Sequence, residues 1–506
     1  MYIINIGHQL KYENECAAML FFPGEKLITT SDLGCMDTGE DYILTVVEQD
    51  GGQWFLFVGV CIGGKAGQSY KVIGPECTNK RDECERLMAY MMYQLLKPIT
   101  GKSPGWGILT GIRPVKLFHK RLDSGISPEE TGREFKEKFL VSSKKINLAL
   151  QTAAKEGPVL KESRPNHFSL YVSVPFCPTR CHYCSFVSQA ISTAKARGLI
   201  PEYTRLLCEE IRCLGKQLAP ANLRLSTVYF GGGTPTTLSA EQLKQVCQAV
   251  AESFDLSTVS EYTVEAGRPD TITREKLQML KKQGVSRISI NPQTLNNQVL
   301  KLIGRNHTAE QTLEAFALAR EEGFDDINMD LIAGLPGDTL ESFCSTIDRI
   351  IALKPENVTV HTLSIKRSAN YGGGENRQKA MEAAQNVEAM VEYAQQRLMG
   401  SGWQPYYLYK QRNTLGNLEN VGYCLPGHEG RYNIYIMDET HTIAAVGGGG
   451  VSKLKDPVTG DISRVFNYKY PFEYISRFDE ILKRKEKVGR FFEKDNAIPL
   501  RKNTEG

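Results

Sequence analysis

The chain has 506 residues, with 61 Lys and Arg, 58 Asp and Glu, and a formal net charge of +3. So small a charge excludes a surface built to coat nucleic acid, and the length indicates two or three domains. The 13 cysteines show no disulfide-like framework, and no apolar stretch reaches the ~18 residues of a membrane span. We therefore expect a cytoplasmic protein with no membrane span and no nucleic-acid partner.

Residues 1–160 form the first predicted part, a module of mixed α and β structure. Two alternating apolar runs, 42–49 and 53–62, flank a short Asp-Gly-Gly segment and predict a β-hairpin. Residues 81–97 carry apolar side chains at helical spacing, with charges on the other face. The Gly- and Pro-rich stretch that follows predicts a loop packed by Trp106.

Three cysteines, Cys177, Cys181 and Cys184, follow an apolar strand in a C-x3-C-x2-C pattern. One short loop can turn three thiolates toward a single point, where they can hold three irons of a cubane cluster and leave the fourth iron open. A zinc site completed by His182, a redox pair of the last two cysteines, and inert thiols are the alternatives. Haem attachment is excluded, because Ser185 stands where that motif requires histidine.

From residue 168 the pattern becomes strand, loop and helix, repeated. Units of this spacing predict a parallel sheet rolled into an open or partial barrel. Functional side chains of such barrels gather at the carboxyl ends of the strands. The candidate strands are 168–174, 226–232, 261–266, 285–291, 325–334 and 357–363.

Uncommon residues stand at these predicted strand ends. The glycine turn 231–233 follows the second strand, where missing side chains let backbone groups approach a ligand. Carboxylates at later strand ends suit ribose or ammonium groups, and Arg305 suits a bidentate grip on a carboxylate. The other residues of this set are Glu265, Gln293 and Asp330.

The cysteine loop resembles the signature of radical S-adenosylmethionine (SAM) enzymes, with Tyr183 before the last cysteine. Tyr171 and Pro175-Phe176 ahead of it narrow the resemblance to the oxygen-independent coproporphyrinogen III oxidase family, which includes dehydrogenases, haem chaperones and haem-degrading methyltransferases. The resemblance covers roughly residues 168–490, and the long N-terminal extension is similar to that of the dehydrogenase branch. Phe186 stands where the well-studied oxidases have a further cysteine, and we expect the chaperone branch to share this feature.

The resemblance implies an α/β fold: a partial (β/α)6 radical SAM barrel over residues 161–375, then a small α+β cap over 376–506. It implies a 4Fe-4S cluster on the three cysteines and SAM beside it. The implied reaction is oxidative decarboxylation of coproporphyrinogen III propionates to vinyl groups, with a reductant such as flavodoxin or ferredoxin. The residues that match SAM-holding positions of the family are Tyr171, Gly232, Gly233, Thr234, Glu265, Gln293, Arg305 and Asp330.

Substrate contacts are expected at Tyr171 and at two basic residues after the sixth strand, Lys366 and Arg367. Surface salt links are the alternative role for that basic pair. The alternative function is a haem carrier of the same family, for which the possible iron ligands are His307, His361 and His428.

The last part of the chain is predicted to mix helices and strands. A helix over 378–403 precedes strands over 404–412, 431–438 and 441–450, and a basic helix covers 474–492. The glycine run 447–450 and the basic helix are expected to form a lid or substrate-facing end, as the resemblance implies.

Overall fold

The computed structural model describes residues 1–186, 188–364, 386–411 and 414–493. The chain divides into two compact units, one of residues 1–153 with 408–419 and one of residues 154–407 with 420–506. The expected three-part division at residues 160 and 375 stays a prediction.

A five-stranded sheet forms the centre of the first unit, in the order β2-β1-β3-β4-β5. The predicted hairpin is confirmed: β3 and β4 pair antiparallel, with Asp50 opposite Gln53. Gly51 and Gly52 close it with φ of 54° and 76°, the left-handed backbone that a two-residue hairpin turn requires. The strands are β1 (Tyr2–Ile6), β2 (Ile28–Thr30), β3 (Tyr42–Asp50), β4 (Gln53–Ile62) and β5 (Lys65–Ile73).

Helix α2 (Lys80–Thr100) packs against β4 and β5 and confirms the predicted helix at 81–97. Trp106 is buried, and its ring N–H donates to the Glu419 carboxylate at 2.7 Å. The same carboxylate receives the Lys145 ammonium at 2.5 Å, so a buried ion pair fixes this part of the first unit. The neighbouring helices are α1 (Lys11–Met19), α3 (Pro114–Asp123), α4 (Pro128–Phe139) and α5 (Ser143–Glu162).

The second unit is built on a larger sheet, with strand order β14-β15-β13-β12-β11-β10-β9-β6-β16-β17-β18. Six neighbouring strands of this sheet, β6, β9, β10, β11, β12 and β13, pair in parallel. They correspond to the six predicted strands. The third, fourth, fifth and sixth are shorter than expected. The parallel strands are β6 (His167–Val174), β9 (Arg224–Gly232), β10 (Glu261–Glu265), β11 (Arg287–Ser289), β12 (Ile327–Ala333) and β13 (Asn357–Thr362).

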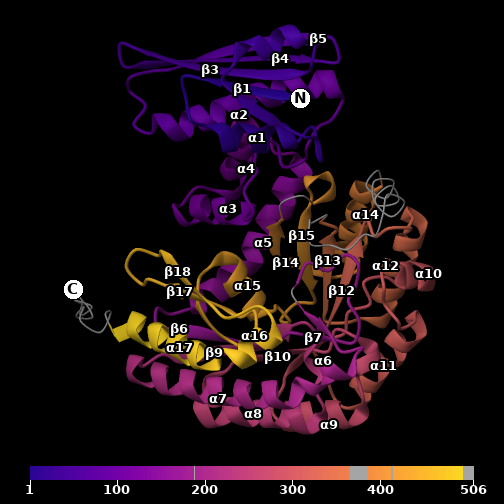
Figure 1. Ribbon diagram of the computed structural model, residues 1–506. Helices are drawn as coiled ribbons and strands as arrows, with labels where there is room; N and C mark the ends of the chain where they lie inside the picture. The colour runs from indigo at the N-terminus through magenta and orange to yellow at the C-terminus, as the bar shows by residue number, and fades with distance from the viewer. Residues whose placement is uncertain (187, 365–385, 412–413, 494–506) are drawn as a thin grey trace. The chain divides into compact units, whose positions relative to one another are not determined.

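Amphipathic helices between these strands cover the outside of the curved sheet (Figure 1). Several begin at a Ser or Thr whose side chain accepts a backbone N–H, for example Ser239 and Thr308, so the caps define where each helix starts. Within the described residues, no helix combines the length and the apolar run needed to cross a bilayer. The helices are α6 (Ala194–Gly198), α7 (Ile200–Leu218), α8 (Ala240–Ser253), α9 (Arg274–Lys282), α10 (Asn297–Leu302), α11 (Ala309–Glu321), α12 (Leu340–Leu353) and α14 (Val387–Gly400).

The C-terminal strands extend the sheet at both edges. Strand β15 (Glu419–Cys424) runs antiparallel to β13, while β16 (Thr442–Val446) runs parallel to β6. The remaining strands are β14 (Gln404–Lys410), β17 (Val451–Lys455) and β18 (Ile462–Phe466).

The predicted strand over 431–438 is wrong, because this segment is helix α15 (Arg431–Asp438). Its residues favour strands, but the Glu261 carboxylate accepts the backbone N–H groups of Arg431 at 2.6 Å and Tyr432 at 3.4 Å. A carboxylate at the first turn satisfies free N–H groups and the helix dipole. This tertiary contact outweighs the local preference.

The predicted basic helix exists as α17 (Phe478–Glu493), after the short α16 (Pro471–Ser476). It packs against α7, where buried Lys485 pairs with Glu210 at 2.9 Å. Glu210 also accepts the Gly447 backbone N–H at 2.7 Å and so positions the glycine run. The helix is therefore bound to α7 of the outer helical layer, and its expected role as a lid stays a prediction.

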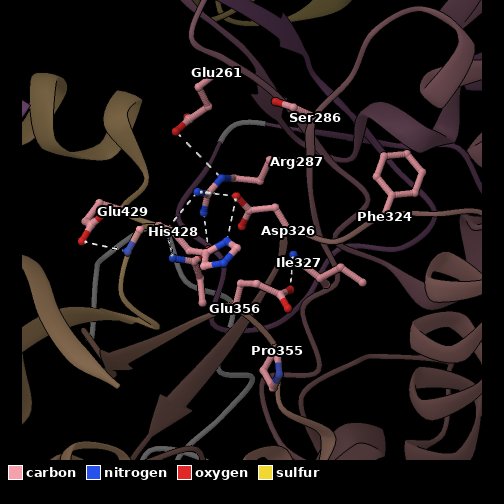
Figure 2. A network of polar contacts seen from close by, with 12 residues as sticks. Glu261, Ser286, Arg287, Phe324, Asp326, Ile327, Pro355, Glu356, His428 and Glu429 are labelled. Atoms are coloured by element: carbon pink, nitrogen blue, oxygen red, sulfur yellow. Dashed lines mark hydrogen bonds and ion pairs between the residues drawn. The ribbon is translucent and has the colours of Figure 1, made fainter. Parts of the chain in front are cut away.

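Ion pairs fill the amino end of the barrel (Figure 2). Arg287 lies 2.9 Å from Asp326 and 3.8 Å from Glu261, and its guanidinium donates to the His428 carbonyl oxygen at 2.9 Å. Burial raises the pKa of Asp326 to about 6, although Arg287 opposes the shift. Charges from β10, β11 and the turn before β12 thus hold three strand starts together.

Candidate active site

The motif cysteines lie on one loop at the carboxyl end of β6. Cys177 ends β7 (Phe176–Cys177), which pairs with β8 (Gln189–Ala190) and so joins the two ends of the loop. Burial raises the pKa of the Cys177 thiol and raises that of Cys184 to about 11, and Cys181 adds to both shifts. The three thiols are therefore near enough to affect one another's charge.

His182 is bound to the backbone at the end of α10. Its ring Nδ1 lies 3.0 Å from the Leu302 carbonyl oxygen, and its backbone N–H donates to the Ile303 carbonyl oxygen at 3.0 Å. These contacts give His182 a structural role that supports the loop. In the part of the chain that the structure describes, no group of three or more His, Cys, Asp and Glu side chains is gathered tightly enough for a single metal ion.

Hydrogen-bond donors point at the cysteine sulfurs. The Thr234 hydroxyl donates to Cys177 Sγ at 3.6 Å, and Arg268 Nη1 donates to Cys181 Sγ at 3.7 Å. Buried Arg305 also interacts with the Cys181 thiol. Buried guanidinium groups require negative charge nearby, which thiolates bound to iron would supply. The residues present therefore fit a thiolate-ligated cluster.

The glycine turn lies against the start of the cysteine loop. Gly232 has a φ of 109°, and a Cβ added at Gly233 would lie 2.5 Å from the Phe176 carbonyl oxygen. The Gly233 N–H donates to Val174 at 2.9 Å, and the Thr234 N–H donates to Phe176 at 2.7 Å. Glycine is thus required first for the close approach of two backbone segments. Any ligand contact of Gly233 and Thr234 would use groups other than these two N–H donors.

Three tyrosine rings stack inside the barrel. The centroid of the Tyr229 ring lies 6.1 Å from that of Tyr171 and 4.4 Å from that of Tyr432, and the Tyr171 and Tyr432 centroids are 6.2 Å apart. Its hydroxyl donates to Glu265 Oε1 at 2.7 Å. The rings come from β6, β9 and α15, so helix α15 completes an aromatic surface beside a carboxyl group.

Two carboxyl groups, Glu265 and Asp330, interact at this surface. Burial raises the pKa of Glu265 to about 8, and the Asp330 charge adds to the shift, while the Tyr229 hydrogen bond opposes it. Burial would also raise the pKa of Asp330, but contacts with His361 and Asn328 hold it below its usual range. One carboxyl is thus protonated at neutral pH and the other is charged, a division typical of sites that bind ligands.

Gln293 follows β11 with a φ of 67°, which is rare for a residue with a side chain. Its backbone N–H donates to the Asp330 carbonyl oxygen at 2.9 Å, and its buried Oε1 has no hydrogen-bond partner within the described residues. Arg305 Nη1 donates to the Asn291 carbonyl oxygen at 2.6 Å. Strain and an unpaired buried amide at a strand end fit a ligand-binding position.

Comparison with known proteins identifies the family. A sequence model of the radical SAM superfamily matches residues 171–350. The oxygen-independent coproporphyrinogen-III oxidase-like protein HemZ of Bacillus subtilis is 41% identical over 433 residues, which are 84% of this chain and 86% of that protein. The chain belongs to the radical SAM family of oxygen-independent coproporphyrinogen III oxidase-like proteins.

Other relatives support the same membership and the fold. The heme chaperone HemW of Lactococcus lactis is 30% identical over 344 residues, covering 67% of this chain and 83% of that protein. The structure of coproporphyrinogen III oxidase HemN from Escherichia coli is similar with a TM-score of 0.50 and 23% identity, over 64% of this chain and 71% of that one. Radical SAM proteins use a 4Fe-4S cluster and SAM, so the predicted family, barrel and cofactors are confirmed.

The predicted site residues divide into those that converge and those that do not. The three cysteines, the glycine turn, Glu265 and Gln293 lie at or after the carboxyl ends of barrel strands. Tyr171 and Asp330 lie within β6 and β12, and Arg305 follows α10 and reaches the Asn291 carbonyl oxygen after β11. Their individual roles stay predictions. Lys366 and Arg367 lie outside the described residues.

The three candidate haem ligands are dispersed. His361 lies 3.8 Å from Asp330 in the barrel, His307 is buried 3.9 Å from Asp270, and His428 pairs with Asp326 at 3.6 Å. His428 therefore belongs to the ion pairs at the amino end.

Sequence reasoning missed three residues of the site: Tyr229, Tyr432 and Arg268. Tyr229 could have been found, because it lies two residues before the glycine turn on an alternating strand. Tyr432 could not, because it reaches the barrel only through the helix that was predicted as a strand. Arg268 stands three residues after Glu265, but its contact with Cys181 depends on how two loops meet.

Proposed function

We propose that this protein catalyses the oxygen-independent oxidative decarboxylation of coproporphyrinogen III propionates to vinyl groups, giving protoporphyrinogen IX. The observation that carries the proposal is the 41% identity to HemZ, a coproporphyrinogen-III oxidase-like protein, over 86% of that protein. We also place the protein in the cytoplasm, which is supported by thirteen described cysteines that are all free thiols.

In this proposal Cys177, Cys181 and Cys184 hold the cluster as thiolates. When bound, the cluster supplies the electron that cleaves SAM and so gives access to a carbon radical able to take a hydrogen atom from the substrate. Thr234 and Arg268 donate to two of the sulfurs and so stabilise the thiolates in a buried site.

SAM would lie along the strand ends beyond the glycine turn. Glu265 would accept its ammonium group and lose a proton in doing so, because its pKa of about 8 makes it neutral in the free site. Asp330 stays charged through His361 and Asn328 and would accept ribose hydroxyls. Arg305 would bind the carboxylate, and the unpaired Gln293 amide would gain a partner.

The stacked tyrosines would close the site against water. Tyr171, Tyr229 and Tyr432 are buried or half-buried and present ring faces beside Glu265, which keeps bulk solvent from the reacting atoms. Lys366 and Arg367 remain the candidates for binding propionates, from their place after the sixth strand, with flavodoxin or ferredoxin as the proposed reductant.

An anaerobic assay tests the proposal. Protein with reconstituted cluster, a reductant, SAM and coproporphyrinogen III should release carbon dioxide and methionine in step, faster than without the porphyrinogen. SAM cleavage that does not respond to the porphyrinogen would contradict it.

A haem carrier is the second candidate, favoured by the 30% identity to HemW over 83% of that chaperone. It would show a stoichiometric haem absorption band that transfers to an apo-haemoprotein, with no porphyrinogen consumed. Transfer of haem without decarboxylation would replace the first proposal by this one.

A further inference from the structure

One buried cation beside the cysteine loop, Arg268, has so far been described only as a hydrogen-bond donor to a sulfur. Arg268 is 3% exposed and follows β10. Its guanidinium donates to the Thr179 hydroxyl at 3.2 Å, to Cys181 Sγ at 3.7 Å and to the two Asp270 oxygens at 3.1 and 3.3 Å. It therefore links the loop after strand β10 to the loop that carries the cysteines.

The surroundings of Arg268 carry an excess of positive charge. Arg305 is 7% exposed and also interacts with Cys181, so two buried guanidinium groups approach one sulfur. Asp270 is paired with Arg268, and its side chain is 25% exposed, so solvent weakens its field.

His307 lies close to the same two arginines. Its ring is fully buried, neither nitrogen has a hydrogen-bond partner among the described residues, and burial with Arg305 and Arg268 lowers its pKa to about 3. The histidine is thus neutral at pH 7 and adds no charge to that of the two arginines.

We propose that Arg268 is a positioning residue that raises the reduction potential of the cluster through its hydrogen bond and charge at Cys181. Reduction adds an electron to a centre with anionic ligands, so a nearby donor and positive charge favour the reduced form. The inference rests on the cluster held by the cysteines and is independent of the substrate.

Asp270 provides a test of sign. The Asp270 carboxylate partly neutralises the Arg268 charge, so Asp270→Asn should leave more positive charge facing Cys181 and raise the potential. Arg268→Met should lower it. If Arg268 only supported the loop, the two variants would not shift the reduction potential in opposite directions.

The experiment is a redox titration of the full chain with reconstituted cluster and no substrate, followed by electron paramagnetic resonance of the reduced cluster. Iron and sulfide contents are measured on the same samples. Arg268→Lys keeps the charge without the planar fork, and Arg274→Met removes a surface arginine on α9 that pairs with Glu321 and serves as control.

We expect a lower midpoint potential for Arg268→Met, a higher one for Asp270→Asn, a value between wild type and Met for Arg268→Lys, and no change for the control. If Arg268→Met loses its iron while Arg268→Lys keeps both its iron and the midpoint potential of wild type, the positive charge at residue 268 is the property that acts on the cluster. Unchanged potentials in iron-replete Arg268→Met, shifts of the same sign in both variants, or loss of iron in both Arg268→Met and Arg268→Lys would overturn the proposal. Failure of the decarboxylation assay alone would leave it untouched.

Discussion

The two ends of the same barrel strands use charge in opposite ways. At the amino ends, Arg287 is placed between the carboxylates of Glu261 and Asp326, and each charge has a protein partner of opposite sign (Figure 2). At the carboxyl ends, two buried arginines, Arg268 and Arg305, interact with the Cys181 sulfur, and Asp270 is the one carboxylate that pairs with Arg268 among the described residues.

The difference separates stability from function within one sheet. Paired charges at the amino ends hold strand starts and cap helix α15, so their loss should destabilise the barrel. Unbalanced charges, the strained Gln293 and the high pKa of Glu265 cost stability, and such features persist where a ligand compensates them. Variants at the two ends should therefore fail in different assays.

The largest expected effect is at the cysteines. Alanine at Cys177, Cys181 or Cys184 should abolish the brown chromophore after anaerobic reconstitution, because each thiolate would hold its own iron. Cys344→Ala on α12 is the matched control and should keep full iron and sulfide content. A variant lacking all three motif cysteines that still binds a full cluster would refute the assignment.

At the amino end, Arg287→Met should destabilise the protein by roughly 3 to 5 kcal/mol, because it leaves buried carboxylates without a counter-charge. Urea unfolding measures this loss. Arg212→Met removes an exposed arginine whose pair with Glu252 should contribute about 1 kcal/mol or less. The iron content of folded Arg287→Met should equal that of wild type. Loss of the cluster from folded Arg287→Met would contradict the assignment of stability to the amino ends and of function to the carboxyl ends.

Arg305→Ala tests the carboxyl end without removing a cluster ligand. It should weaken SAM binding by roughly 1.5 to 3 kcal/mol, the usual range for a hydrogen bond to a charged group. Calorimetry under anaerobic conditions measures the affinity, with Arg274→Ala as the surface control. Equal affinities in wild type and Arg305→Ala would remove Arg305 from the set of SAM-binding residues.

The barrel was predictable because its strands are short apolar runs bounded by Gly, Asp and Asn and separated by helical segments. Segment 431–438 was not, because its helix depends on a carboxylate that is distant in sequence, Glu261. Local preference cannot report such a contact.

The site shows the same limit. Glu265 and Asp330 could be predicted because functional residues of parallel barrels gather towards the carboxyl ends of the strands, which meet at one edge of the sheet. That rule could not find the pairing of Arg268 with Cys181 or the third ring of the tyrosine stack, because both depend on how loops and helix α15 pack in three dimensions.

The smallest effect concerns pH. Glu265 has a pKa of about 8 in the free site because burial disfavours its charged form. If its carboxylate pairs with the SAM ammonium, binding must release a proton, and affinity must rise with pH up to about 7.7, where the α-ammonium of free SAM begins to lose its own proton. Affinity rises with pH because the pKa of Glu265 is higher in the free protein than in the complex with SAM.

We therefore expect SAM affinity to increase by roughly 5- to 10-fold between pH 6 and pH 7, where the SAM ammonium keeps its proton, as follows from a free pKa near 8 and a bound pKa well below 6. Calorimetry in buffers of different ionisation enthalpy should detect close to one proton released at pH 7. Glu265→Gln keeps the shape and the Tyr229 contact, so it should bind SAM more weakly at pH 7 and lose the rise in affinity between pH 6 and pH 7. A pH profile that Glu265→Gln leaves unchanged would assign the proton to another group and would place the ammonium of SAM away from β10.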